Sequence, residues 1–182
     1  YVFFLDADEE LTPELSQEIR AVVASGSRDV WEVPWEQVAF GRRLTAMSTR
    51  GRVPRLFYRA SLKGYEGLVH EAPIMRGDFQ HRALQHRLPH YSRETIYGSL
   101  SKLAQYSQLG AVKRAQMGKR GGVWRGLASG VAGFLRLYIG QRGILCGGAG
   151  FLHCFLVGLE CFFRYAALEY DREHLNQIVK RS

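Results

Sequence analysis

The chain has 182 residues, a formal net charge of +8, and a composition that is 46% hydrophobic and 12% aromatic. These values exclude wholesale disorder and are sufficient for one domain with a hydrophobic core, alone or with an appendage. The odd number of cysteines and the lack of a C-x-x-C pair argue against a disulfide framework and a zinc ribbon.

The first residues predict an α/β unit that carries an acidic cluster. The apolar run 1–5 predicts a buried strand, and the sequence DADEE follows it at 6–10. Four carboxylates at the mouth of a buried strand predict a positively charged partner there. Thr12 and Pro13 provide an N-cap and a first helical residue, so we expect a helix that ends at Gly26.

Residues 29–91 predict a set of short strands. Segments such as VWEVPWEQVAF and RVPRLFYR are rich in β-branched and aromatic residues and are separated by Gly or Pro. We expect these strands to pair in an antiparallel or mixed arrangement. A long helix is predicted to follow from about residue 93 to residue 110 or somewhat further, with Ser92 as its cap.

The C-terminal part predicts helices that bind an anionic surface. Residues 95–159 contain no Asp or Glu but many Lys and Arg, and such a field attracts phosphate on nucleic acid, nucleotides or lipids. Two apolar segments, 123–140 and 150–170, approach the length of a membrane span, although charges such as Arg136 and Glu160 interrupt them. We expect amphipathic helices in a membrane interface. The alternatives are a pair of core helices, a re-entrant hairpin and an ordinary solvated basic face.

Polar residues at predicted strand ends form a candidate metal site. In an α/β sheet, ligands bind at the carboxyl ends of the strands, where Asp6 and Asp8 lie. Two carboxylates one residue apart are hard oxygen ligands that suit Mg²⁺ or Mn²⁺. His90 ends another predicted strand, and its imidazole is a further candidate ligand. A solvated acidic turn and a structural histidine are the alternatives.

Further candidates for catalysis and binding lie among the predicted strands. Glu71 follows a short apolar strand end and, beside a metal site, has the position of a general base. Arg55 and Arg59 are candidates for binding a phosphate or an anionic group of a sugar, and His70 is a candidate substrate contact. An exposed loop pair and solvated strand residues are the corresponding alternatives.

The order of these motifs resembles a known family. The matching segments cover most of the chain and are FLDADEELTPEL, RLFYR, GLVHEAP, LPHYS, KLAQYSQLGA and FLRLYIGQRGILCGGAGF. Together they resemble the family 2 glycosyltransferases with the GT-A fold, and more narrowly the bacterial branch related to lipopolysaccharide core β-glucosyltransferases. The chain lacks the Gln-x-x-Arg-Trp signature of processive synthases, so a single transfer is favoured.

The resemblance implies an α/β fold and a role for each matched residue. Residues 1–117 would form the C-terminal half of a Rossmann-like GT-A catalytic domain, with the nucleotide-binding half expected upstream. Residues 118–182 would form a helical, membrane-associating region. The metal-binding positions of the family match Asp6, Asp8 and His90, the catalytic base of inverting members matches Glu71, and the implied cofactor is a divalent cation, Mg²⁺ or Mn²⁺.

The expected function is therefore inverting transfer of a sugar from a nucleotide-sugar donor to a lipid-linked or cell-envelope glycan acceptor. We expect the protein to lie on the cytoplasmic face of the bacterial inner membrane, in contact with anionic lipid and without nucleic acid. Two other classes stay open: a non-catalytic basic protein that binds a membrane surface or nucleic acid, and a metal-dependent phosphotransferase or nucleotidyltransferase. The chain has no recognised nucleic-acid-binding motif, which argues against nucleic-acid binding, and no P-loop, which argues against a phosphotransferase or nucleotidyltransferase.

Overall fold

The computed structural model describes residues 1–47, 51–66, 72–173 and 175, and this part of the chain divides into two units. A sheet unit comprises Tyr1–Gln37 and Ser48–Tyr91, and a helical unit comprises Val38–Met47 and Ser92–Ser182. The helix after residue 95 packs against the C-terminal helix and belongs to the same unit. The catalytic and membrane-associating regions expected at 1–117 and 118–182 stay a prediction.

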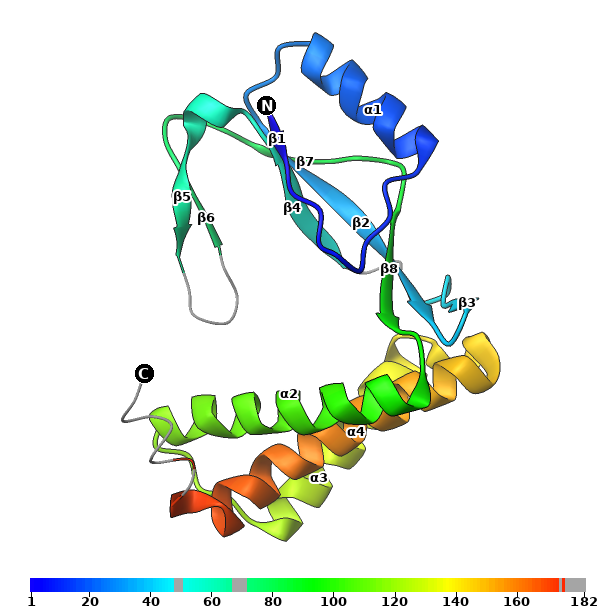
Figure 1. Ribbon diagram of the computed structural model, residues 1–182, viewed down its shortest axis with the longest axis vertical. Coiled ribbons are helices and arrows are strands. Elements are labelled where there is room, and N and C mark those ends of the chain that lie inside the picture. Colours follow the sequence, from blue (N-terminus) through cyan, green and yellow to red (C-terminus); the bar gives the residue numbers. More distant parts are fainter. Residues whose placement is uncertain (48–50, 67–71, 174, 176–182) are drawn as a thin grey trace. The chain divides into compact units, whose positions relative to one another are not determined.

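The sheet unit is built around one long central strand, β2 (Val30–Ala39). This strand is antiparallel to β4 (Arg52–Phe57) and parallel to β7 (His81–Ala83), and β8 (Leu88–Arg93) also pairs with it. At the far side of β4 lies β1 (Val2–Phe3), which is antiparallel to β4. The strands are labelled in Figure 1. The prediction of a mixed sheet in an α/β chain is therefore confirmed.

Helix α1 (Pro13–Ala24) follows the acidic loop and contributes its apolar side to the core of the sheet unit. The Thr12 hydroxyl accepts a hydrogen bond from the backbone N–H of Leu15 at 3.3 Å, which confirms the predicted N-cap. After the helix, Gly26 adopts a positive φ of 71°, as expected for a residue that ends a helix. Leu15 and Val22 are buried with apolar residues of β2, β4 and β8.

A separate two-stranded sheet follows β4 in the chain. A short 3₁₀ turn (Arg59–Ser61) leads into β5 (Leu62–Glu66), and β5 pairs antiparallel with β6 (Ala72–Met75). The segment that joins β5 to β6 contains two residues predicted to act in catalysis and binding, Glu71 and His70. Both lie outside the described residues.

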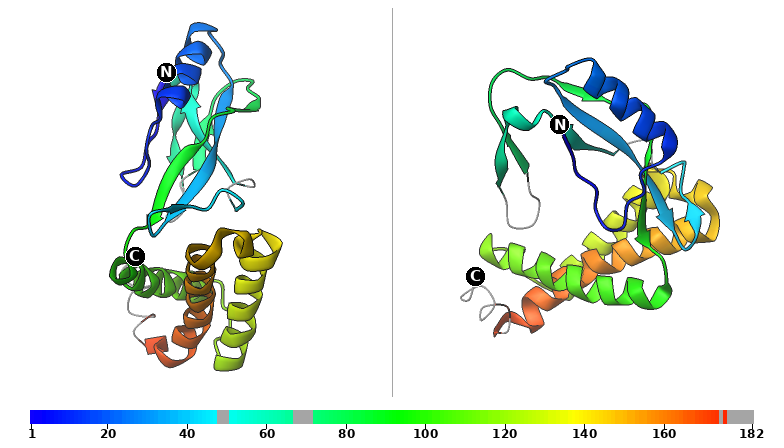
Figure 2. Two further views of the ribbon diagram at one scale, coloured as in Figure 1. Left: turned by 90° about the vertical axis from the view of Figure 1, so that its right-hand side faces the viewer. Right: turned by 45° about the horizontal axis from the view of Figure 1, so that its top comes forward.

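The helical unit consists mainly of α2 (Ile96–Gln116), α3 (Val123–Leu135) and α4 (Gly147–Tyr170). Helix α4 packs against both α2 and α3, and Figure 2 shows these helices from two further directions. A π-helical turn, η2 (Arg136–Gly140), and a 3₁₀ turn, η3 (Gly143–Cys146), connect α3 to α4. The expectation of helices in both apolar segments is confirmed.

Helix α2 begins three residues later than predicted. The expected cap, Ser92, belongs to β8, and its carbonyl oxygen accepts a hydrogen bond from Lys102 Nζ at 3.1 Å. The cap is Thr95, whose hydroxyl accepts from the backbone N–H of Gly98 at 3.0 Å. The prediction of Ser92 as the N-cap was wrong. Ser and Thr are both good N-cap residues, and Ser92 is instead part of β8, which pairs with β2.

Helices α3 and α4 approach each other closely because glycines lie between them. A Cβ atom on Gly130 would lie 2.9 Å from the carbonyl oxygen of Gly158, and one on Gly126 would lie 2.8 Å from that of Phe162. Together with Gly133, the two glycines of α3 recur at intervals of four and three residues, which places them on one side of the helix. The larger side chains of α3 are therefore left for its other side.

The charges that interrupt the apolar sequence of α4 are bound inside the helical unit. Glu160 is only 5% exposed, and its carboxylate binds Arg93 Nη2 at 2.6 Å and Arg164 Nη2 at 3.4 Å. Among the described residues, one helical stretch, Gly143–Tyr170, is long and apolar enough to cross a membrane by length and composition. The ion-paired side of α4 is thus turned toward the protein.

Candidate functional site

The acidic loop after β1 runs alongside β8. The backbone N–H of Tyr91 donates to the carbonyl oxygen of Asp8 at 2.8 Å, and Glu9 and His90 form an isolated antiparallel bridge. These backbone bonds bring the loop at 6–10 next to the strand that carries His90, although about 80 residues separate the two segments in the sequence. The candidate site is built on this pairing.

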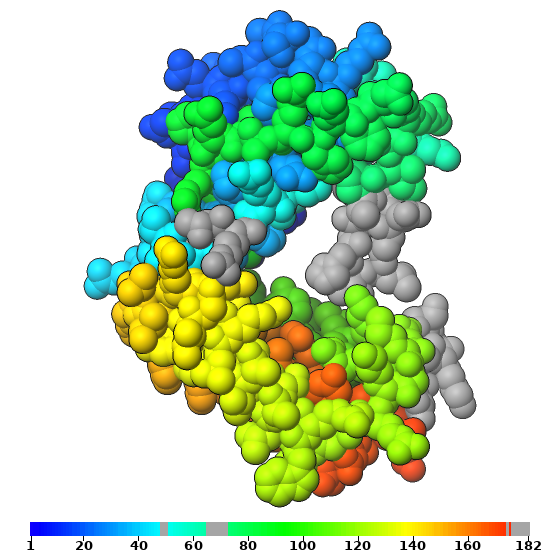
Figure 3. Space-filling view, turned by 180° about the vertical axis from the view of Figure 1, so that it is seen from behind, coloured from blue at the N-terminus to red at the C-terminus, as the bar shows by residue number. Residues whose placement is uncertain are grey.

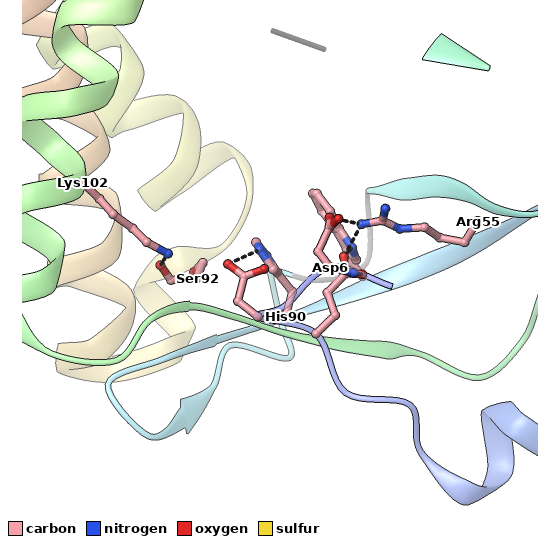
Figure 4. Close-up of polar contacts among 8 residues, drawn as sticks. Asp6, Arg55, His90, Ser92 and Lys102 are labelled. Atoms are coloured by element: carbon pink, nitrogen blue, oxygen red, sulfur yellow. Dashed lines mark hydrogen bonds and ion pairs between the residues drawn. The ribbon is translucent and has the colours of Figure 1, made fainter. Parts of the chain in front are cut away.

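A positively charged side chain does lie at the acidic cluster, and it is Arg55. The backbone N–H of Phe4 donates to the carbonyl oxygen of Arg55 at 2.9 Å, which sets β4 beside the end of β1. From there, Arg55 Nη2 binds the carboxylates of both Asp6 and Glu9, and Figure 4 shows this contact. Burial alone would lower the pKa of Arg55, but the hydrogen bonds and charges of these two carboxylates outweigh it and raise the pKa. The guanidinium therefore stays charged and neutralises part of the cluster.

Glu9 is the buried centre of this network. Its side chain has no exposed surface, and besides Arg55 it accepts hydrogen bonds from the Asp6 backbone N–H at 3.0 Å and from Trp35 Nε1 at 2.9 Å. Sequence reasoning did not assign roles to Glu9 and Trp35. The available signal was that Glu9 lies in a carboxylate cluster too dense for every member to face water.

Asp8 faces His90 across the candidate site. Asp8 Oδ2 lies 3.4 Å from His90 Nε2, and the ring of His90 stacks on that of Trp35 with 4.7 Å between centroids and an interplanar angle of 12°. His90 Nδ1 is buried and has no hydrogen-bond partner among the described residues. The stacking and the backbone bridge fix the imidazole with Nε2 directed at Asp8, as drawn in Figure 4.

Asp6, Asp8 and His90 do not form a closed metal site. Within the described part of the chain, no group of three or more His, Cys, Asp or Glu side chains is arranged to hold a metal ion. The predicted set is therefore divided, because Asp6 binds Arg55 whereas Asp8 faces His90. One carboxylate and one imidazole still suit Mg²⁺ or Mn²⁺, since such ions commonly retain waters and bind substrate phosphates.

Arg59 does not lie at the acidic loop. In the β1–β4 pairing, Phe57 opposes Val2 and Leu56 opposes Phe3, so later residues of the β4 segment run away from the end of β1 that carries Asp6. Instead, Arg59 lines a separate pocket of about 650 Å³ together with Tyr58, Ala60, Leu62, Lys63 and Gly64. The two predicted phosphate-binding arginines therefore occupy opposite ends of the paired strands.

The chain is similar to a protein of Rickettsia felis (strain ATCC VR-1525 / URRWXCal2) that is named "Uncharacterized glycosyltransferase". The two are 23% identical over 199 aligned residues, which cover 100% of this chain and 68% of the Rickettsia protein. No protein-family model and no solved structure matches the chain. The similarity supports a glycosyltransferase relationship, and the mixed α/β architecture is consistent with a domain of that kind.

Proposed function

We propose that the chain carries part of the active site of an inverting family 2 glycosyltransferase with the GT-A fold. The enzyme would move a sugar, in a single transfer, from a nucleotide-sugar donor to a lipid-linked or cell-envelope glycan acceptor such as lipopolysaccharide. The observation that carries the proposal is that Asp8 faces His90 at the end of β1 while Arg55 neutralises the carboxylates beside them. The similarity to a protein named as a glycosyltransferase supports this chemical interpretation.

Asp8 and His90 are the residues that would hold Mg²⁺ or Mn²⁺ together with the donor. When bound, the cation supplies positive charge that stabilises the leaving diphosphate. Asp6 keeps Arg55 as its partner and fixes the loop, so we assign to it the positioning of Asp8 and not direct coordination. Arg59 and Lys63, in their separate pocket, are assigned to an anionic group of the substrate.

Glu71 is proposed as the general base, with His70 as a neighbouring substrate contact. The Glu71 carboxylate takes the proton of the acceptor hydroxyl as that oxygen forms a bond to the anomeric carbon. The bond from this carbon to the diphosphate breaks, and the diphosphate leaves with the electron pair. Because attack and departure occur on opposite faces of the sugar, the configuration at the anomeric carbon is inverted.

The test is nucleotide release by the full-length protein in the presence of acceptor membranes and Mn²⁺. We expect Glu71→Gln to reduce transfer at least about 100-fold, since a general base contributes roughly 10²–10⁴ to the rate. Asp8→Asn should also reduce transfer strongly, because the cation that stabilises the leaving diphosphate would lose a ligand. The matched control is Glu14→Gln, which removes an exposed carboxylate from the first turn of α1 and should keep full activity.

Binding of Mn²⁺, measured by electron paramagnetic resonance, separates the two roles. Asp8→Asn should weaken binding of the ion in the presence of donor, whereas Glu71→Gln should leave it unchanged. Normal turnover by Glu71→Gln would remove Glu71 as the base. Unchanged Mn²⁺ binding and unchanged turnover in Asp8→Asn would contradict the proposed site.

A further inference from the structure

The outer side of α3 exposes large apolar residues. They recur at intervals of three or four positions and form the apolar stripe: Trp124, Leu127, Val131 and Leu135. Trp124 is 82% exposed and Val131 is 50% exposed. The stripe lies on the opposite side of α3 from the glycines that contact α4, so the helix has small residues inside and large residues outside. Figure 3 shows α3 in yellow-green at the surface of the helical unit.

An apolar groove between α3 and α4 continues the stripe. The groove has a volume of about 350 Å³, and its wall includes Leu127, Val131, Phe134, Phe151, Phe155 and Phe162. Leu145, in the 3₁₀ turn η3 between α3 and α4, is 69% exposed. Stripe, groove and turn together form the outer face, which is larger than the isolated apolar residues that soluble surfaces normally carry.

Arginines border the outer face. Arg125 and Arg136 each follow a residue of the stripe by one position, so both lie about 100° around the helix from it. Both are exposed, and no carboxylate occurs anywhere in residues 95–159. Side chains of this length can reach past an apolar contact surface while keeping their charge at its edge.

The charges around the outer face indicate which kind of partner binds there. A second copy of the chain placed face to face would bring identical rows of arginines together, which disfavours association. Anionic lipid headgroups are complementary to those rows, and acyl chains are complementary to the stripe and groove. Glu160 of α4 is buried and ion-paired inside the unit, whereas Phe151 and Phe155 of the same helix are exposed beside the groove. A one-sided apolar surface fits a helix that lies in the interface.

We propose that the outer face docks the helical unit onto an anionic membrane surface. The apolar stripe and the groove contact acyl chains, while Arg125 and Arg136 contact lipid phosphates. This inference does not depend on glycosyl transfer, because it can be measured without donor or acceptor.

Vesicle flotation tests the docking. The full-length protein should float with vesicles of phosphatidylcholine mixed with phosphatidylglycerol and much less with phosphatidylcholine alone. Leu127→Ser combined with Val131→Ser should weaken binding about tenfold or more, given the apolar area that is no longer transferred from water. Arg125→Gln and Arg136→Gln should each weaken binding to the anionic vesicles about fivefold, since a basic residue near such a surface contributes about 1 kcal/mol.

Matched controls come from the sheet unit. Leu11→Ser removes an apolar residue that is 41% exposed, and Arg20→Gln removes an exposed arginine of α1. Both variants should bind the vesicles as the wild type does, and so should Asp8→Asn, whose expected effects are on Mn²⁺ binding and transfer. A loss of transfer without loss of binding would therefore separate the active site from the docking face.

Tryptophan fluorescence reports which residue enters the lipid. Addition of anionic vesicles should shift the emission to shorter wavelength, and Trp124→Phe should abolish the shift while leaving flotation intact. Wild-type protein that does not float with anionic vesicles, or a Leu127→Ser, Val131→Ser double variant that floats normally, would overturn the proposal. Self-association that is lost in the Leu127 and Val131 double variant, without lipid binding, would instead identify a second copy as the occupant.

Discussion

Replacement of Arg55 by Met tests how the acidic loop is held in place. Methionine retains much of the apolar stem of arginine but lacks the guanidinium that binds Asp6 and Glu9. The variant would leave Glu9 with a fully buried carboxylate and two remaining donors, the Asp6 backbone N–H and Trp35 Nε1. Asp6, with a side chain that is 58% exposed, would be released to water.

The expected loss in the free energy of unfolding follows from the environments of Glu9, which is buried, and Asp6, which is exposed. Removal of one partner of a buried ion pair costs about 3–5 kcal/mol, because the other charge is left uncompensated. The two donors that Glu9 keeps place the expected loss in the free energy of unfolding at the lower end, about 3 kcal/mol. Adding Glu9→Gln removes the uncompensated charge and should restore roughly 1–2 kcal/mol.

Urea unfolding at neutral pH, followed by circular dichroism, measures these free energies. The matched control is Arg59→Met, which removes an exposed arginine four positions further along and should change stability by less than about 0.5 kcal/mol. If Arg55→Met costs no more than Arg59→Met, the buried network around Glu9 does not hold the loop and the reasoning fails.

The remaining predictions concern packing and pH. Gly130→Ala should destabilise the protein by about 1–3 kcal/mol, because the new methyl group meets the carbonyl oxygen of Gly158 at 2.9 Å; thermal unfolding should show no such loss for Gly148→Ala, which has open space. Burial would raise the pKa of Glu18, but hydrogen bonds from residues 85–86 outweigh it and lower the pKa. That stabilisation is present above the unfolded pKa and is lost as the pH falls through the folded pKa. Glu18→Gln should therefore cost about 1 kcal/mol at neutral pH, and equilibrium unfolding across a pH series should show this difference disappear in acid; a constant difference would refute the assignment.

Local sequence signals predicted the elements that local chemistry determines. Helix α1 follows from Thr12 at its cap and Gly26 after its end, and both act as expected. The β-branched segments predicted the mixed sheet. The buried strand expected at 1–5 was wrong, because only Val2–Phe3 pairs, at the edge of the sheet, and both residues are half-buried. The start of α2 was missed because two residues, Ser92 and Thr95, are equally able to cap a helix, and only the partner strand of β8 excludes the first.

The contacts of the candidate site depend on strand register, which sequence patterns do not specify. The chemistry of strand ends suggested that Asp8 and His90 would meet, and the structure brings them together. To predict that Arg55 is the partner of Glu9, one must know that β4 pairs with β1 and in which register. A shift of the register by one residue would turn the Arg55 side chain to the other face of the sheet. The same limit applies to Glu160, whose partner Arg93 is 67 residues away.

The glycine contact between α3 and α4 changes the kind of substitution that the inward side of α3 rejects. In most helices, polar substitutions are harmful inside and neutral outside. Here the inward positions such as Gly126 are limited by volume, so that even one added carbon is harmful. Outward positions such as Leu127, which is 47% exposed, should accept a change of size or polarity without loss of folding. A saturation scan of α3 would therefore distinguish its two sides. The inward positions should reject any larger residue, whereas the outward positions should reject neither larger nor polar residues.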